Sequence, residues 1–141
     1  MLHFELVTLD GTKISEEVYE VLLPTPQGQV GVLPHHIPLV TIAVPGVISV
    51  RKHQNDPDNQ MEVFATNGGA IEVINDTLRV LVDEADKPED INEQEARKAY
   101  DRARQLLREA KDQVELEEAH SLLQRHAVRL KVAEIRRHRR H

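Results

Sequence analysis

A short stretch, residues 24–46, restricts the fold of this chain more than any other part of the sequence. It holds five of the seven prolines and three of the six glycines of the 141-residue chain. Proline fixes the backbone angle φ and glycine permits positive φ, so the backbone path is narrowly specified here. Apolar runs at 30–33 and 37–44 alternate with these residues and predict brief strands joined by tight turns. We expect such a segment either to hold a ligand or to present a surface.

Residues 1–86 show the period-2 pattern that is typical of half-buried strands. Apolar and polar side chains alternate over residues 2–6, 61–65 and 78–82. Turn-forming pairs such as Asp10-Gly11 and Pro45-Gly46 recur about every 8–12 residues, the spacing of short antiparallel strands. This part of the chain is therefore predicted to be a β-sandwich or barrel.

The pattern changes to a helical one after a short polar linker at residues 86–90. Asn92, with Glu95 three residues later, predicts the start of a helix with a capping box. Apolar residues then recur at helical spacing in two segments, each predicted to be about 19–22 residues long. The first segment contains Ala96, Ala99, Tyr100, Ala103, Leu106, Leu107 and Ala110, and the second contains Leu116, Ala119, Leu122, Leu123, Ala127, Leu130 and Ala133.

The short connection between these helices predicts an antiparallel helical hairpin. The chain is thus assigned to the α+β class, with a β-sandwich at 1–86 followed by a two-helix hairpin at 87–141. The apolar faces of the helices are narrow and rich in alanine, so they bury little area. We expect the hairpin to need a partner surface, either the β-domain or another protein, and to be a candidate switch.

The charges of the two parts differ in sign. Residues 1–86 carry a net charge of −9 and residues 87–141 a net charge of +3, which suggests two modules with different partners. The chain has no cysteine, so it forms no disulfide. It has no apolar run of about 18 residues that would span a membrane, and its first residues do not resemble a signal peptide. We expect it to stay in the compartment where it is made.

The residue types that carry chemistry do not form a recognisable catalytic or metal-binding pattern. The Gly28-x-x-Gly31 turn lacks the Lys-Ser/Thr of a phosphate-binding loop. His35 and His36 are adjacent, and His120 and His126 are six residues apart, so neither pair has the spacing of metal ligands. We therefore predict no enzyme activity, no metal and no required cofactor.

The second helix and the tail at 136–141 form a cationic rod. Three interpretations remain open: a nucleic-acid arm, a solvated helix face, or a surface that meets an acidic protein. One alternative for the whole chain is a stand-alone β-domain binding module with a basic helical arm for nucleic acid or an acidic protein partner. The acidic first part of the chain disfavours nucleic acid because it repels phosphate.

Three segments of the chain resemble the epsilon subunit of the rotary ATP synthase, which is called delta in mitochondria. Residues 28–39 are similar to the family pattern Gly-Glu-x-Gly-Ile-x-Pro-Gly-His-x-Pro-Leu, except that Gln29 replaces Glu and His35 replaces Gly. Residues 64–73 are similar to its Gly-Gly-x-x-Glu-Val strand pair, and the two-helix tail completes the match. The resemblance implies a flattened β-sandwich followed by a helical hairpin.

The resemblance also implies a non-catalytic rotor subunit in the central stalk of a proton-translocating ATP synthase. Its implied partners are the gamma subunit, the membrane rotor ring of c subunits and, when the hairpin extends, the catalytic alpha and beta subunits. By position, Gln29, Val30 and Gly31 match a ring-facing loop, and His36 matches a histidine near the gamma contact. The inhibitory contact that blocks ATP hydrolysis would fall on Arg125, Arg129, Arg136 and Arg137. The expected location is peripheral, at the cytoplasmic face of the plasma membrane or, alternatively, at the matrix or stromal face of an organelle membrane.

Some bacterial members of this family bind ATP through an Ile-Asp-x-x-Arg-Ala motif and further arginines. The matching residues here are Ile91, Asn92 and Ala96, supported by Arg102, Arg125 and Arg129. Asn92 replaces the motif's Asp, and Glu95 replaces its Arg. A carboxylate at the place of a cation repels phosphates, so we expect ATP binding to be weak or absent. A nucleotide-sensing regulator is thus a third hypothesis for the chain.

Overall fold

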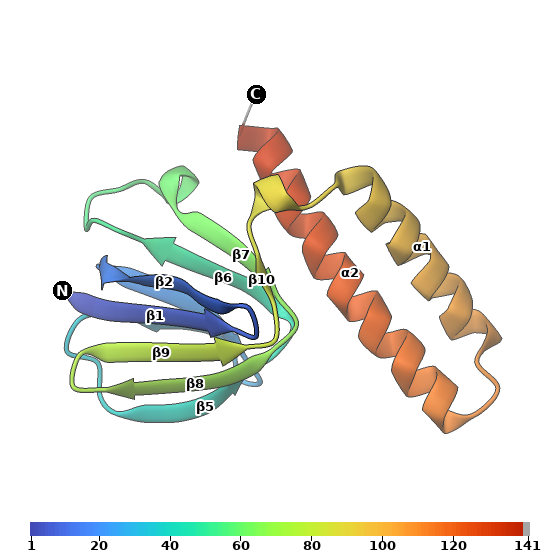
Figure 1. The fold of residues 1–141 in the computed structure, drawn as a ribbon, viewed down its shortest axis with the longest axis horizontal. Helices are drawn as coiled ribbons and strands as arrows, with labels where there is room; N and C mark the ends of the chain where they lie inside the picture. Colours follow the sequence, from blue (N-terminus) through green and yellow to red (C-terminus); the bar gives the residue numbers. More distant parts are fainter. Residues whose placement is uncertain (140–141) are drawn as a thin grey trace.

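Alternating apolar residues build two five-stranded sheets that pack face to face, and two helices follow them (Figure 1). This computed structural model describes residues 1–139. Sheet A has the strand order β2-β1-β9-β8-β5, and sheet B has the order β10-β7-β6-β3-β4. The strands are β1 (Leu2–Thr8), β2 (Gly11–Val18), β3 (Glu20–Thr25), β4 (Gly28–Val32), β5 (Leu39–Ala43), β6 (Gly46–Arg51), β7 (Glu62–Thr66), β8 (Gly69–Ile74), β9 (Thr77–Val82) and β10 (Ala85–Asp86).

The inward-facing side chains of both sheets form one apolar core. The largest of its fully buried members are Phe4, Phe64, Leu2, Leu6 and Leu23. All neighbouring strands pair antiparallel except β1 and β9, which pair parallel. A fully buried aliphatic or aromatic side chain stabilises a fold by about 1.5–3 kcal/mol, so this core accounts for much of the stability of the sandwich. The predicted fold class, a β-sandwich followed by two helices, is confirmed.

The stretch at 24–46 forms one edge of the sandwich. It contains β4, one of the two edge strands of sheet B, and β5, one of the two edge strands of sheet A. Its two ends meet, because Val44 N donates a hydrogen bond of 3.0 Å to Pro24 O. A Cβ at position 46 would lie 2.6 Å from Pro24 Cβ, so only glycine fits there. The proline and glycine content of this stretch therefore specifies a crossing between the two sheets.

His35 adopts a left-handed backbone conformation at a position where the similar family pattern has glycine. Its φ is 65°, and its backbone N–H donates to Asp76 Oδ1 at 2.5 Å. Its ring Nδ1 lies 3.2 Å from Asp76 Oδ2. Asp76 belongs to the β8–β9 turn, so these contacts join the crossing to sheet A. The contacts with Asp76 stabilise a backbone conformation that is otherwise unfavourable for a residue with a side chain.

Two helices of unequal length form the hairpin. α1 (Glu93–Glu109) has 17 residues and α2 (Gln113–Arg139) has 27. Asn92 Oδ1 accepts from Glu95 N at 3.0 Å, which confirms the expected helix start. Asp112 caps α2 in the same way, accepting from Glu115 N at 2.8 Å. The expectation of two helices of 19–22 residues is wrong: at about 1.5 Å per residue they span about 25 and about 40 Å.

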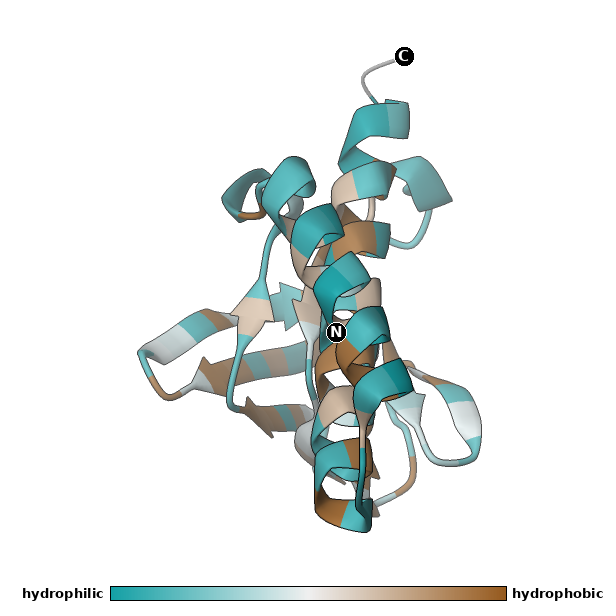
Figure 2. Ribbon diagram, turned by 90° about the vertical axis from the view of Figure 1, so that its right-hand side faces the viewer, coloured by the Kyte–Doolittle hydropathy of each residue, from teal (hydrophilic) through white to brown (hydrophobic). Residues whose placement is uncertain are grey.

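The C-terminal half of α2 packs against the sandwich as well as against the start of α1. Leu130, Val132 and Ala133 join Val63 and Ala65 of β7 in a second apolar cluster. Figure 2, which faces the hairpin, shows mostly hydrophilic residues on the outward side of both helices. Among residues 1–139, neither helix is both long enough and apolar enough to cross a bilayer. The partner surface that the hairpin needs is thus the outer face of sheet B.

Candidate functional site

Two ion pairs join α2 to the acidic end of the sandwich. Arg125 donates from Nε to Glu84 Oε1 at 2.7 Å and from Nη2 to Glu84 Oε2 at 3.0 Å. Four residues further along the same face of α2, Arg129 donates to Asp86. Glu84 and Asp86 lie at β10, directly before the linker to the hairpin. These pairs hold the hairpin to the sandwich at the point where the two parts are connected.

The Arg125–Glu84 pair is charged at neutral pH. Hydrogen bonding to Arg125 lowers the pKa of Glu84, against the opposing effect of burial. The same hydrogen bonds raise the pKa of Arg125. Both side chains remain partly exposed, so the pair stabilises docking by no more than about 1 kcal/mol. An ion pair with so small a free energy does not by itself prevent the hairpin from separating from the sandwich.

A cleft of about 260 Å³ between the helices brings together part of the predicted nucleotide set. Asn92, Ala96, Arg125 and Arg129 line it. Glu95, Ala99 and His126 complete its lining.

The other two residues of the predicted nucleotide set lie elsewhere. Ile91 is 6% exposed and belongs to the apolar cluster under α2. Arg102 is exposed and does not line the cleft. Both arginines that do line the cleft are already paired with carboxylates, and Glu95 adds a further negative charge. The cleft therefore offers little attraction to phosphate.

His126 is a site residue that sequence reasoning considered only as a metal ligand. Its Nδ1 is buried and has no hydrogen-bond partner within residues 1–139. Burial lowers the pKa of His126, and the neighbouring Arg125 and Arg129 lower it further. The signal in the sequence that could have indicated this role of His126 is the pair of arginines that flank it, one residue before and three residues after.

The predicted ring-facing residues lie in a strand and not in a loop. Gln29, Val30 and Gly31 belong to β4, the edge strand of sheet B, directly after the tight turn at Gly28. Gln29 and Gly31 are exposed, and Val30 is half-buried. β4 pairs with β3 on one side only, so its other edge presents backbone hydrogen-bonding groups. His36 lies a few residues further on, where its N–H donates to Leu33 O at 3.2 Å.

The outer face of sheet A carries an exposed apolar row next to this edge. Ile42, Ala70, Leu81 and Val7 lie side by side across β5, β8, β9 and β1. Ile42 is 56% exposed and Leu81 47%, and Val40 beside them is 81% exposed.

The next row on the same face is charged and contains Glu72, Arg79 and Glu5, with Arg79 Nε 3.0 Å from Glu5 Oε2. Sequence reasoning missed this face, because alternation identifies the buried side of a strand but not a partner for its other side.

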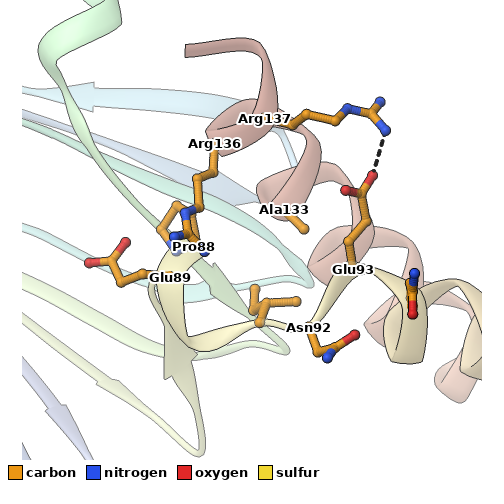
Figure 3. A pocket seen from close by; sticks show the side chains of 9 residues that line it. Pro88, Glu89, Asn92, Glu93, Ala133, Arg136 and Arg137 are labelled. Carbon is orange, nitrogen blue, oxygen red and sulfur yellow. Dashed lines mark ion pairs between the residues drawn. The ribbon is translucent and has the colours of Figure 1, made fainter. Parts of the chain in front are cut away.

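The two predicted inhibitory arginines near the C-terminus line a pocket of about 570 Å³ beside the start of α1 (Figure 3). Arg137 Nη1 lies 2.9 Å from Glu93 Oε1. Arg136 extends in a different direction, toward Pro88 (Figure 3). The four arginines of the predicted inhibitory contact therefore lie along α2, and three of them are paired within the chain.

The chain is a two-layer β-sandwich with a docked helical hairpin, and comparison with known proteins identifies its family. Residues 1–88 match the beta-sandwich domain of the ATP synthase Delta/Epsilon chain, and residues 89–134 match the long alpha-helix domain of the same chain. This chain belongs to the ATP synthase delta/epsilon family.

Named relatives agree with this assignment. An ATP synthase epsilon chain of Herpetosiphon aurantiacus is 35% identical over 98% of both chains. A chloroplastic epsilon chain of Adiantum capillus-veneris is 35% identical over 86% of this chain and 88% of its own length.

A chain of the Euglena gracilis mitochondrial ATP synthase OSCP/F1/c-ring structure shares the fold with a TM-score of 0.80 at 23% identity, over 94% of this chain and 81% of that one. A chain of the Tetrahymena thermophila central stalk and c-ring structure has a TM-score of 0.62 at 14% identity, over 94% of this chain and 96% of that one.

Proposed function

We propose that this chain is a non-catalytic central-stalk rotor subunit of a proton-translocating ATP synthase, coupling rotation of a membrane ring to the catalytic head. The observation that carries the proposal is the edge formed by β4 and β5, which the chain's own hairpin leaves uncovered. A contiguous exposed apolar row favours a protein partner. The Tetrahymena structure that has this fold is named for a central stalk and c-ring, in agreement with such a role.

In this proposal each uncovered surface has its own partner. The gamma subunit binds the apolar row of sheet A and His36, and the c-ring contacts Gln29, Val30 and Gly31. The subunit is then peripheral to the membrane, at the cytoplasmic face of the plasma membrane or at the corresponding face of an organelle membrane. A nucleic-acid arm is disfavoured because three of the four α2 arginines at issue pair with carboxylates of the chain itself.

The hairpin is proposed to inhibit ATP hydrolysis when it leaves the sandwich. Arg125, Arg129, Arg136 and Arg137 would then meet acidic segments of the catalytic alpha and beta subunits. In the docked position the first two pair with Glu84 and Asp86 and the fourth with Glu93. Arg125 and Arg129 would have to leave Glu84 and Asp86 to make the inhibitory contact, which supports two alternative states of the hairpin.

Deletion of residues 87–141 in the assembled complex tests the two parts of the proposal separately. We expect ATP hydrolysis to rise while the shortened chain still co-purifies with gamma and the ring. Unchanged hydrolysis would remove the inhibitory role alone. Failure of the full-length chain to co-purify with gamma and the ring would remove the stalk role. Replacing Arg125 and Arg129 with glutamine in the full-length chain is a milder test of the same inhibitory contact.

A further inference from the structure

The last turns of α2 extend past the part of the chain that the family's long-helix domain describes. That match ends at residue 134, whereas α2 continues to Arg139. Within the extension, residues 135–139, Ile135 and Arg136 are half-buried and the last three residues are exposed, but the extension still contacts the rest of the molecule. Ile135 packs against the apolar cluster under α2, and Arg137 pairs with Glu93 at the start of α1.

Arg139 makes the contact that distinguishes this extension. Its Nη1 donates to Met61 O at 2.7 Å and its Nη2 donates to Asp58 O at 3.3 Å. Both carbonyls belong to a single 3₁₀ turn, η1 (Asp58–Gln60), and the residue that ends it. Asp58 O already accepts the N–H of Met61 at 3.1 Å, and a carbonyl oxygen has a second lone pair with which it can accept from Arg139 as well. The planar guanidinium fork of arginine can reach two such acceptors at once, which a lysine cannot do with the same geometry.

The sandwich itself holds this turn in place. Arg51, whose side chain is only 14% exposed, donates from Nε to Glu20 Oε1 at 3.1 Å and also donates to Asp56 O and Asp58 Oδ1. These bonds join the β6–β7 connection to β3 and β6 of the sandwich. The acceptors for Arg139 are therefore positioned by the sandwich and do not depend on the hairpin.

We propose that residues 135–139 are a lock that keeps the hairpin on the sandwich, with Arg139 as the residue that engages the η1 turn. The hairpin leaves the sandwich only after Arg139 releases the two carbonyls, whereas the Arg137–Glu93 pair joins α2 to α1 and lies within the hairpin. The lock rests on the proposed function in one respect, namely that the hairpin leaves the sandwich at all. Whether the released hairpin inhibits hydrolysis is a separate question.

A single reporter thiol measures release of the hairpin directly. The chain has no cysteine, so Val132→Cys places one thiol at a fully buried position between α2 and sheet B. Its rate of reaction with a small thiol reagent reports how often the hairpin opens. Adding Arg139→Ala should raise this rate about three- to tenfold, the size expected for loss of one good and one long hydrogen bond from a charged donor. Arg139→Lys should give an intermediate rate.

Lys131→Ala is the matched control, because Lys131 is an exposed cation on the same helix. It should change the rate by less than about twofold. The lock is overturned if Arg139→Ala leaves the rate unchanged, or if Lys131→Ala raises it as much. Loss of helix by circular dichroism in Arg139→Ala, but not in the control, would also overturn it, because Arg139 would then hold the helix and not its docking.

A double-mutant cycle with Arg51→Gln tests the route through the η1 turn. If Arg139 acts on a turn that Arg51 holds, the two substitutions together should raise the rate by less than the product of their separate effects. Independent effects would overturn this route. The assay uses the isolated chain, so its failure leaves the hydrolysis result for the 87–141 deletion unaffected, and the two hypotheses fail separately.

Discussion

At the residue scale, we expect His126 to make docking of the hairpin dependent on pH. Its pKa lies below the ordinary 6.5 because of burial and of the charges on Arg125 and Arg129. Glu84 opposes this shift, and Glu95 lines the same cleft. Unfolded or released chains therefore bind a proton on His126 at a higher pH than the docked state does. The stability that the docked state gains from a neutral His126 is fully present above the ordinary pKa of histidine and declines as the pH falls below that pKa.

Thermal unfolding at about pH 7.5 and about pH 5.5 checks this prediction. The unsubstituted chain should lose more stability over this interval than His126→Gln, which cannot take up the proton. Glu84 does not interfere, because its lowered pKa keeps it ionised until the pH falls below its ordinary 4.5. An equal loss of stability in both proteins would contradict the role of His126.

Glu95 is expected to oppose nucleotide binding in the cleft between the helices. It faces the cleft together with Arg125 and Arg129, whose guanidinium groups already have carboxylate partners. Glu95→Arg should raise the affinity for ATP about tenfold or more, since it replaces a repulsive charge by an attractive one. Calorimetric titration measures this, with Glu118→Arg on the exposed surface of α2 as the control. Micromolar binding of ATP by the unsubstituted chain, with tightening of the hairpin, would show the expectation to be wrong.

At the scale of single elements, β5 provides the side chains with which the proposed gamma contact can be tested. Ile42→Glu should weaken binding to gamma about tenfold or more, because it places a charge within an apolar row. Stability should change by less than about 0.5 kcal/mol, since Ile42 is already 56% exposed. Leu9→Glu is the matched control, at an apolar residue in the β1–β2 turn that is 83% exposed. Pull-down with gamma measures binding, and equal binding by both variants would argue against this surface.

The elements also show how far a single sequence specifies this fold. Period-2 alternation identified β1 and β9, each of which buries one face in the core. It also identified β7, which buries one face in the core and the other under α2. The same reasoning was less successful for α2, which packs on two partners. Ala127, assigned to the apolar face, is exposed, whereas Val132 is fully buried against the sandwich. A helix with two contact surfaces does not show one apolar stripe, so its length and second face could not be read from periodicity.

The candidate site was predicted in its residue types but not in its pairing. The arginines at 125 and 129 were identified from their positions and their likeness to a family motif. Their partners, Glu84 and Asp86, lie about forty residues earlier in the chain. No local pattern connects a carboxylate at the end of a sandwich to a particular turn of a helix. These contacts depend on how the hairpin lies across sheet B, which only the folded chain determines.

At the scale of the whole molecule, the difference in charge between the two parts has a structural consequence. The acidic sandwich and the basic hairpin attract one another, and the ion pairs Arg125–Glu84 and Arg129–Asp86 cross their junction. The apolar cluster around Val63 and Val132 contributes a second, salt-insensitive attraction. The docked state is thus stabilised by an electrostatic attraction that salt screens and by an apolar contact that it does not screen. Their relative sizes determine how strongly docking depends on salt concentration.

Raising the chloride concentration separates these two components. Between about 0.05 M and about 0.5 M the screening length falls from about 14 Å to about 4 Å, so the attraction between the oppositely charged parts weakens. The reporter thiol at Val132→Cys should therefore react several-fold faster at the higher concentration. Adding Arg125→Gln and Arg129→Gln should make the reaction fast already at low salt and remove most of its salt response. A rate that does not change with salt would mean that the apolar cluster alone holds the hairpin, and the ion pairs would then fix only its orientation.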